Sequence, residues 1–200
     1  MSDQVIVALI GAVGIVVVAL IGLVERRREK RRAQPARAVR DHVRIYDTLT
    51  ELRHETDARR VAVVRTHNGG GIPSARVPLY SSALAEVTDG DAPPLRERWK
   101  ALPVTETYAR LLADMLTAAE VRVTPADLGD SRLAAIYEIG GTRSALKALL
   151  GTDPEALYYL SVQWPDDAHV VDAAARLAID AAVRELRRAL TLGTPDTPAD

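Results

Sequence analysis

The chain of 200 residues contains no cysteine, which excludes disulfide bonds, thiol catalysis and thiolate metal ligands and agrees with a reducing cytoplasm. It also lacks Gly-Lys-Ser, Gly-Lys-Thr and Gly-x-Ser-x-Gly, the signatures of a phosphate-binding loop and of a serine hydrolase elbow. His42, His54 and His169 have no second histidine at metal-ligand spacing. We therefore expect no metal, no cofactor and no enzymatic activity.

Charge is absent from Val5 to Val24, and the run Glu25-Arg-Arg-Arg-Glu-Lys-Arg-Arg32 follows at once. A helix of that length rises about 30 Å, which matches the hydrocarbon thickness of a bilayer. The pattern predicts a short N-terminus and a transmembrane helix in residues 1–24, and a basic juxtamembrane linker in residues 25–35.

The basic residues lie on one side of this apolar segment only. Lysine and arginine are absent before Val5 and crowd the segment after Val24, so the positive-inside bias predicts a cytoplasmic domain and an outside N-terminus. Acidic Met1-Ser-Asp-Gln4 and the missing small-residue cleavage site favour a retained signal anchor over a cleaved signal peptide. We expect a single-pass protein of the bacterial inner membrane, with the lipid bilayer as its first partner.

The remainder of the chain is acidic. Residues 41–200 hold 18 lysines and arginines against 24 aspartates and glutamates, a net charge of −6. Phosphate binding needs a clustered positive face, so we expect no nucleic-acid partner. About 150 residues suit a single domain with its own core, which we place at residues 36–190, with a disordered tail at 191–200.

Hydrophobic periodicity divides this domain into helices and strands. Helical spacing covers 35–57, 104–117, 131–139 and 168–190, and extended patterns cover 61–66, 77–87, 120–124 and 156–164. Thr142 to Leu150 has a helical composition, but its position before Gly151-Thr-Asp-Pro154 and another strand favours a hairpin. We assign it as a strand, which predicts an α+β domain with a mostly antiparallel five-stranded sheet flanked by helices.

Two motifs accompany this order of elements: Gly141-Thr-Arg-Ser144 precedes a strand pair, and Tyr158-Tyr-Leu-Ser-Val-Gln-Trp164 forms the closing strand. Together they resemble a GAF domain, the sensory relative of the PAS fold. Arg65-Thr-His-Asn-Gly-Gly70 followed by Ser82-Ala-Leu-Ala-Glu86 is similar to membrane-anchored GAF-like proteins of bacteriophages and mobile elements. The resemblance implies a sheet with a ligand pocket on one face and the terminal helices on the other. Strand alternation should send Tyr158 and Tyr159 to opposite faces.

The candidate ligand site combines a strand end with its partner strand. The glycines after the first strand allow close approach of a ligand, and an even spacing of four should place Ser82 and Glu86 on one face. The alternative is that Asn68-Gly69 forms a turn and the polar side chains satisfy backbone groups. Taken as a cluster, the predicted ligand-binding residues are His67, Asn68, Gly69, Gly70, Ser82 and Glu86.

Two functions fit these features. The first is a membrane-anchored sensor that binds a small molecule or a partner without chemistry of its own. The second is a phage-encoded structural or interaction protein, serving lysis or host takeover, with no small-molecule ligand. A partly polar cavity would favour the first, and a pocket filled by the chain's own side chains the second. Apolar stripes on both terminal helices also predict a homodimer.

Overall fold

The computed structural model describes residues 35–68, 78–129, 131–167 and 169–192. The predicted transmembrane helix, the basic linker up to residue 34, Gly69, Gly70 and the last eight residues of the tail lie outside these ranges. Among the described helices, none has the length and apolar character needed to cross a membrane. A compact unit begins at Val43, and the fold below is the fold of that unit.

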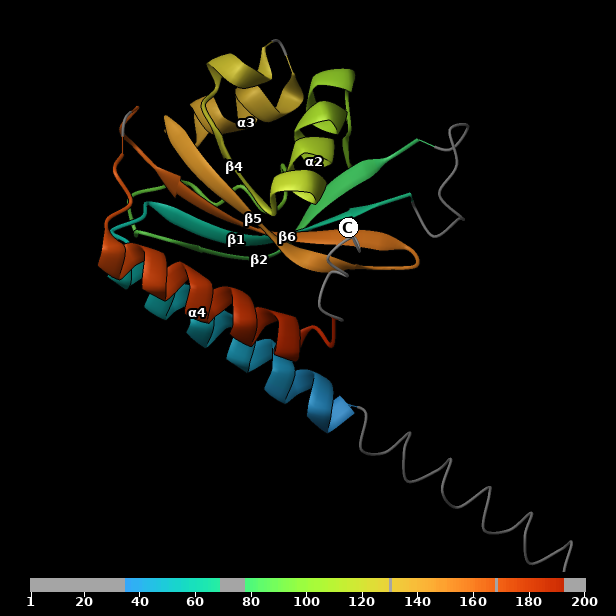
Figure 1. The fold of residues 1–200 in the computed structure, drawn as a ribbon, viewed down its shortest axis with the longest axis vertical. Helices are drawn as coiled ribbons and strands as arrows, with labels where there is room; N and C mark the ends of the chain where they lie inside the picture. The colour runs from blue at the N-terminus through green and yellow to red at the C-terminus, as the bar shows by residue number, and fades with distance from the viewer. Residues whose placement is uncertain (1–34, 69–77, 130, 168, 193–200) are drawn as a thin grey trace, which may run out of the picture. The chain divides into compact units, whose positions relative to one another are not determined.

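A single antiparallel sheet of six strands runs through the unit (Figure 1). The order across the sheet is β3-β2-β1-β6-β5-β4. The strands are β1 Arg60–His67, β2 Tyr80–Thr88, β3 Leu102–Pro103, β4 Glu120–Val123, β5 Ser144–Asp153 and β6 Ala156–Trp164. The α+β prediction is therefore confirmed, and the ambiguous segment 142–150 is indeed a strand.

The prediction of five strands was wrong, because β3 adds a sixth at the edge of the sheet. This strand has two residues, Leu102 and Pro103, which pair with Ser81 and Tyr80 of β2. Two residues show no alternation, and a proline is tolerated only at such an edge. The pairing with β2, rather than any local pattern, makes this segment a strand.

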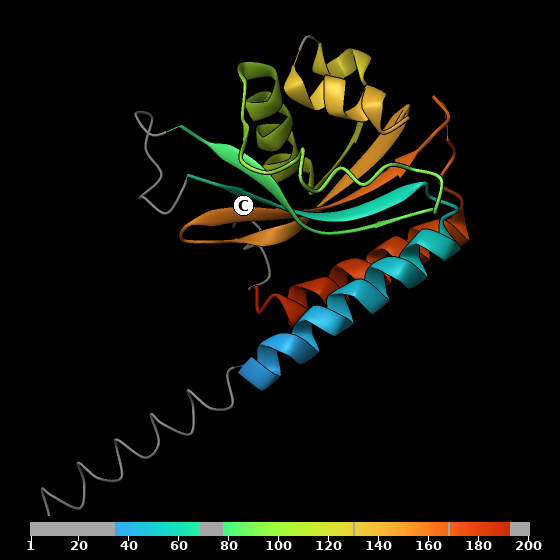
Figure 2. The ribbon, with the colours of Figure 1, turned by 180° about the vertical axis from the view of Figure 1, so that it is seen from behind.

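Helices cover both faces of the sheet (Figures 1 and 2). Helix α2 (Glu106–Ala118) and helix α3 (Arg132–Ile139) lie on one face, which we call the α2/α3 face, with a 3-10 turn at Ala126–Leu128 beside them. Helix α4 (Ala173–Ala189) and the helical residues 43–55 cover the other, the α4 face. Helix α4 begins later than predicted, because Asp172 caps it by accepting a hydrogen bond from Ala175 N at 2.8 Å.

Successive side chains along each strand point to opposite faces of the sheet and pack in two separate hydrophobic clusters. In β1, Ala62 and Val64 pack on the α2/α3 face, whereas Val61 and Val63 pack on the α4 face. Tyr159 belongs to the first cluster, and Tyr158 packs against the second, as the alternation predicted.

A β-bulge in β2 interrupts this alternation. The register pairs Val63 with Ala85 and Val64 with Ala83, which leaves Leu84 as an extra residue. Consequently Ala83 packs on the α2/α3 face and Ala85 on the α4 face. Every β2 side chain before the bulge therefore points to the opposite face from the one that a regular strand would give it.

Candidate functional site

The bulge separates the predicted site residues. His67 and Ser82 lie together on the α4-face side of the sheet, with 3.0 Å between His67 Nε2 and Ser82 Oγ. Ser82 Oγ also accepts a hydrogen bond from Ala101 N at 2.9 Å. Glu86 pairs with Ala62 and points to the α2/α3 face. The expectation that Ser82 and Glu86 share a face was wrong, because it assumed a strand without a bulge.

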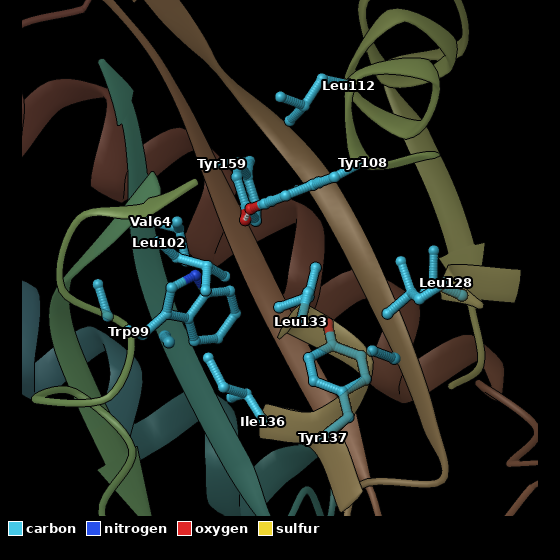
Figure 3. Packing of buried hydrophobic residues seen from close by; sticks show 14 of the residues in the cluster. Val64, Trp99, Leu102, Tyr108, Leu112, Leu128, Leu133, Ile136, Tyr137 and Tyr159 are labelled. Carbon is cyan, nitrogen blue, oxygen red and sulfur yellow. Dashed lines mark hydrogen bonds between the residues drawn. The ribbon is translucent and has the colours of Figure 1, made fainter. Parts of the chain in front are cut away.

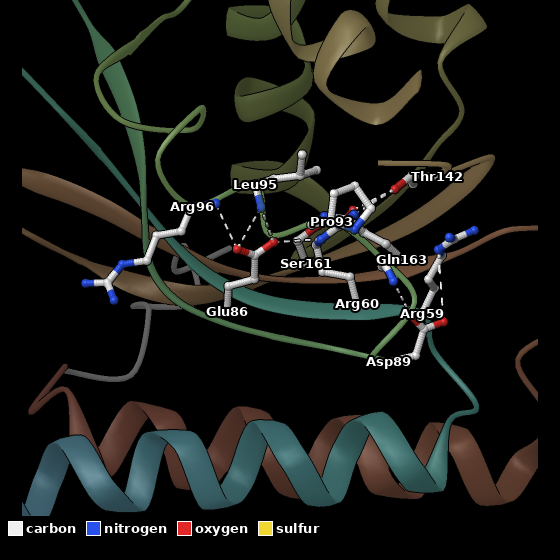
Figure 4. Close-up of polar contacts among 11 residues, drawn as sticks. Arg59, Arg60, Glu86, Asp89, Pro93, Leu95, Arg96, Thr142, Ser161 and Gln163 are labelled. Carbon is white, nitrogen blue, oxygen red and sulfur yellow. Dashed lines mark hydrogen bonds and ion pairs between the residues drawn. The ribbon is translucent and has the colours of Figure 1, made fainter. Parts of the chain in front are cut away.

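The Glu86 carboxylate makes a buried ion pair with Arg60 (Figure 4). Arg60 Nε donates to Glu86 Oε1 at 2.7 Å, and the backbone amides of Leu95 and Arg96 donate at 3.0 and 2.8 Å. The side chains of Arg60 and Glu86 are 0% and 5% exposed. These contacts anchor the turn at residues 95–99 to the sheet, the role that the alternative interpretation gave to Glu86.

Arg60 is held on every side of its guanidinium. Nη2 donates to Pro93 O at 2.6 Å, and Nη1 lies 3.3 Å from Gln163 Oε1 and 3.4 Å from Thr142 Oγ1. Burial lowers the pKa of Arg60, and the Glu86 carboxylate opposes that effect. A side chain at Gly140 would bring its Cβ within 2.6 Å of Arg60 Nη1, so the absence of a side chain there leaves room for the guanidinium.

The other predicted residues flank the end of β1. His67 is half-buried, and its pKa is lowered, first by burial and then by the nearby Arg65 cation. Asn68 is buried, and its side-chain amide makes no hydrogen bond with the described residues. Gly69 and Gly70, the predicted site residues at which a ligand would approach the backbone, lie outside the described residues.

Sequence reasoning missed a buried lysine on the α2/α3 face. Lys147 of β5 is 0% exposed, and its Nζ has no hydrogen-bond acceptor among the described residues. Three aromatic rings surround it instead, at 5.4 Å for Trp99, 5.4 Å for Tyr137 and 4.7 Å for Tyr159, measured to the ring centroids. We call Trp99, Tyr137 and Tyr159 the Lys147 cage. The only signal in the sequence is a lysine inside the apolar run Ala145-Leu-Lys-Ala-Leu-Leu150.

Tyr108 lies in the same layer as the cage, among aliphatic side chains of the core (Figure 3). The hydroxyl of Tyr108 hydrogen-bonds that of Tyr159 and lies 2.8 Å from Ser81 Oγ. Burial raises the pKa of Tyr108 to about 12 and raises those of Tyr137 and Tyr159 as well, so all three phenols are neutral near pH 7. Burial lowers the pKa of Lys147 to about 7.

An open cavity of about 360 Å³ lies along α2 between Ala109 and Leu116 and is almost entirely apolar. We call it the α2 cavity. Its walls come from α2, the end of β1, the start of β2 and the β5–β6 hairpin, through Thr66, Leu79, Ala109, Leu112, Ala113, Leu116 and residues 152–157. Thr66 is buried, and its hydroxyl makes no hydrogen bond with the described residues.

Comparison of this geometry with solved structures finds sensory domains. A far-red cyanobacteriochrome photoreceptor is 13% identical, with a TM-score of 0.54 over 84% of this chain and 97% of that one. The GAF domain of a two-component sensor histidine kinase from Bacillus halodurans is 10% identical, with a TM-score of 0.52 over 75% and 92%. The third GAF domain of a Synechocystis protein, in its photoproduct state, is 14% identical, with a TM-score of 0.52 over 73% and 90%.

The fold is GAF-like. At these identities the likeness concerns the fold alone. A search against protein-family models found no match, and neither did a search of curated proteins. The GAF-like fold confirms the expected order of elements, with the terminal helices on one face of the sheet and α2 and α3 on the other.

Proposed function

We propose that the protein is a membrane-anchored, non-catalytic sensory domain that binds an apolar small molecule in the α2 cavity. The cavity carries this proposal, because its volume of about 360 Å³ lies in the range of about 300–1,000 Å³ typical of small-molecule sites. Its aliphatic walls select an apolar ligand. Since the chain has no cysteine, the ligand cannot be held by a thioether bond.

The GAF-like fold supports a sensory role. Two of the similar structures belong to light-responsive proteins and a third to a sensor histidine kinase. Leu112 lines the α2 cavity and also belongs to the core cluster that contains Tyr108 and Tyr159. A bound molecule that packs against Leu112 would therefore favour one arrangement of α2 over another, which is the change of state that a sensor needs.

Filling the cavity should abolish ligand binding. Ala113 is an exposed residue of α2 in the cavity wall, and Ala113→Trp would place an indole where the ligand packs. We expect native mass spectrometry of the full chain, extracted from membranes of its host, to show a small-molecule adduct on the wild-type protein. The Ala113→Trp variant should carry none.

Ala118→Trp is the matched control, since Ala118 is exposed on the same helix and does not line the cavity. It should keep the adduct. An adduct that survives Ala113→Trp would place the ligand elsewhere, and His67→Ala in the same assay tests the site predicted at the end of β1. A wild-type chain without any adduct would contradict small-molecule binding.

The anchor and its orientation belong to the same proposal. They rest on the uncharged run Val5 to Val24 and on the arginines that follow it. Because the chain has no cysteine, any introduced cysteine is unique. A membrane-impermeant maleimide should label Ser2→Cys in intact cells, and should label Leu177→Cys, 70% exposed on α4, only after lysis. Labelling of both before lysis would contradict a cytoplasmic domain.

A homodimer through the terminal helices is a further part of the proposal. Val43 and Leu177 are large apolar side chains that are 54% and 70% exposed on the two helices of the α4 face. Confinement to a membrane plane would raise the effective concentration of copies. Oxidation of Val43→Cys in membranes should yield a covalent dimer, and a purely monomeric product would exclude contact at this position.

The second candidate function is a docking protein, with the fold kept as a surface for lysis or host takeover in a phage or other mobile element. One observation favours it: the centre of the α2/α3 face is occupied by the chain's own Trp99, Tyr108, Tyr137, Tyr159 and Lys147. An adduct lost only in Ala113→Trp favours the sensor. A wild-type chain without an adduct favours the docking protein.

A further inference from the structure

We propose that the Lys147 cage is a cation-binding site which the chain fills with its own ammonium group, and that the protonation of this group controls how α3 and the Trp99 turn pack on the sheet. The site is distinct from the α2 cavity and gives the domain a second, proton-dependent input. The proposal rests on two observations: three ring centroids lie within 5.4 Å of Lys147 Nζ, and that group has no hydrogen-bond acceptor among the described residues.

Two opposing effects set the protonation of Lys147. Complete burial removes the ammonium from water and favours the neutral amine, which lowers the pKa to about 7. The faces of Trp99, Tyr137 and Tyr159 carry partial negative charge, which attracts a desolvated ammonium. The rings thus compensate in part for lost hydration, and the resulting pKa of Lys147 lies in the range where a cell's pH varies.

Among the ionisable groups of the cage and its aromatic layer, Lys147 is the one that titrates near neutral pH. Tyr137 on α3, Tyr159 on β6 and Tyr108 on α2 all have raised pKa values and stay neutral. Arg60 of β1, whose charge acts on Tyr137, forms a 2.7 Å ion pair with Glu86 of β2, and burial is what lowers the pKa of Lys147. A proton taken up by Lys147 is therefore not cancelled by a nearby carboxylate.

Proton uptake would act on the elements that supply the rings. Tyr137 comes from α3, and Trp99 comes from the turn that the Arg60–Glu86 pair holds against the sheet. Trp99 and Tyr137 also contact each other edge to face, with ring centroids 6.3 Å apart. An ammonium pulls the ring faces closer, whereas a neutral amine does not, so α3 and the Trp99 turn should shift together when Lys147 titrates.

The sequence makes a direct test possible, because Lys30, Lys100 and Lys147 are its only lysines. In the full chain labelled with ¹³C-lysine, three Cε signals can be followed by NMR as the pH rises. We expect one of these signals, lost in Lys147→Met, to titrate near pH 7, well below the ordinary lysine value of about 10.4. Indole and phenol signals of Trp99 and Tyr137 should shift with the same midpoint.

Variants of the cage separate a binding site from simple burial. Tyr137→Leu keeps Lys147 buried but removes one ring, so the midpoint should fall by a further half to one unit, about the contribution of one cation–π contact. Trp99→Phe keeps a weaker ring and should lower it less. The proposal would be overturned by any of three results. The midpoint of Lys147 in the wild-type chain could lie near 10, the ring signals could stay constant through the titration, or the midpoint could be the same in Tyr137→Leu as in the wild type. None of these outcomes depends on a ligand in the α2 cavity.

Discussion

Glu86→Ala should destabilise the folded domain by about 3–5 kcal/mol, the typical result of breaking a buried ion pair by removing one partner. The variant leaves the guanidinium of Arg60, 0% exposed, without its counter-charge. It also removes the acceptor for the backbone amides of Leu95 and Arg96, each of which then carries its own desolvation cost. Urea unfolding of the purified chain, followed by tryptophan fluorescence, measures the loss.

Two further variants make this result specific. Glu97→Ala removes an exposed carboxylate from the same turn and should change stability by no more than about 0.5 kcal/mol. Arg60→Met combined with Glu86→Leu removes both charges and should recover much of the loss, because no unpaired ion remains. If Glu86→Ala unfolds at the wild-type urea concentration, the carboxylate is not needed for the fold and its predicted role as a ligand-binding group gains support.

Lys147→Met should have the opposite effect and stabilise the domain by about 2–4 kcal/mol at slightly acid pH. Methionine has nearly the shape of lysine without the charge, and replacing a buried charge by a well-packed apolar side chain is often stabilising. Lys147 is buried among the three rings of its cage, so the gain at slightly acid pH measures the cost of burying its ammonium less the cation–π attraction.

The pH dependence of this gain has a definite sign. The pKa of Lys147 is about 7 in the folded chain, below its ordinary value of about 10.4 in the unfolded chain. Between these values the unfolded chain binds more protons, so the stability of the wild-type protein rises with pH across this window. Below about pH 7 the full cost is present, and the advantage of Lys147→Met should be largest there and should vanish near pH 10.

The same substitution at an exposed lysine provides the comparison. Lys100→Met should leave the stability almost unchanged, since Lys100 is exposed. Urea midpoints collected from about pH 6 to pH 10 for the three proteins are the measurement. A destabilised Lys147→Met chain at low pH would mean that the cage outweighs the cost of burial, and that the ammonium helps to hold the α2/α3 face together.

The secondary structure of this domain was readable from local patterns. The β-branched run at Val61-Ala-Val-Val64 specified a strand, and α3 begins after Ser131, an N-cap residue whose hydroxyl accepts a hydrogen bond from Ala134 N. The order of these elements was enough to indicate a GAF-like α+β fold. Strand β3 escaped prediction, because a two-residue edge strand exists only through its partner.

The site was less predictable, because it depends on which face each side chain joins. Four residues separate Ser82 from Glu86, yet the extra residue Leu84 sends them to opposite faces. Nothing in the sequence marks Leu84 as a bulge. Likewise, no local pattern shows what surrounds Lys147, because its neighbours Tyr137 and Trp99 come from α3 and from a distant turn.

The sequence by itself determined the helices, the strands other than β3, their order, and the uncharged segment and arginine run on which the predicted anchor rests, since these follow from propensity, periodicity and charge along a short stretch of chain. Only the tertiary structure decided that Glu86 pairs with Arg60, that His67 meets Ser82, and that three rings enclose Lys147. Those contacts join residues 10 to 48 positions apart in the numbering. Strand pairing and helix packing bring them together.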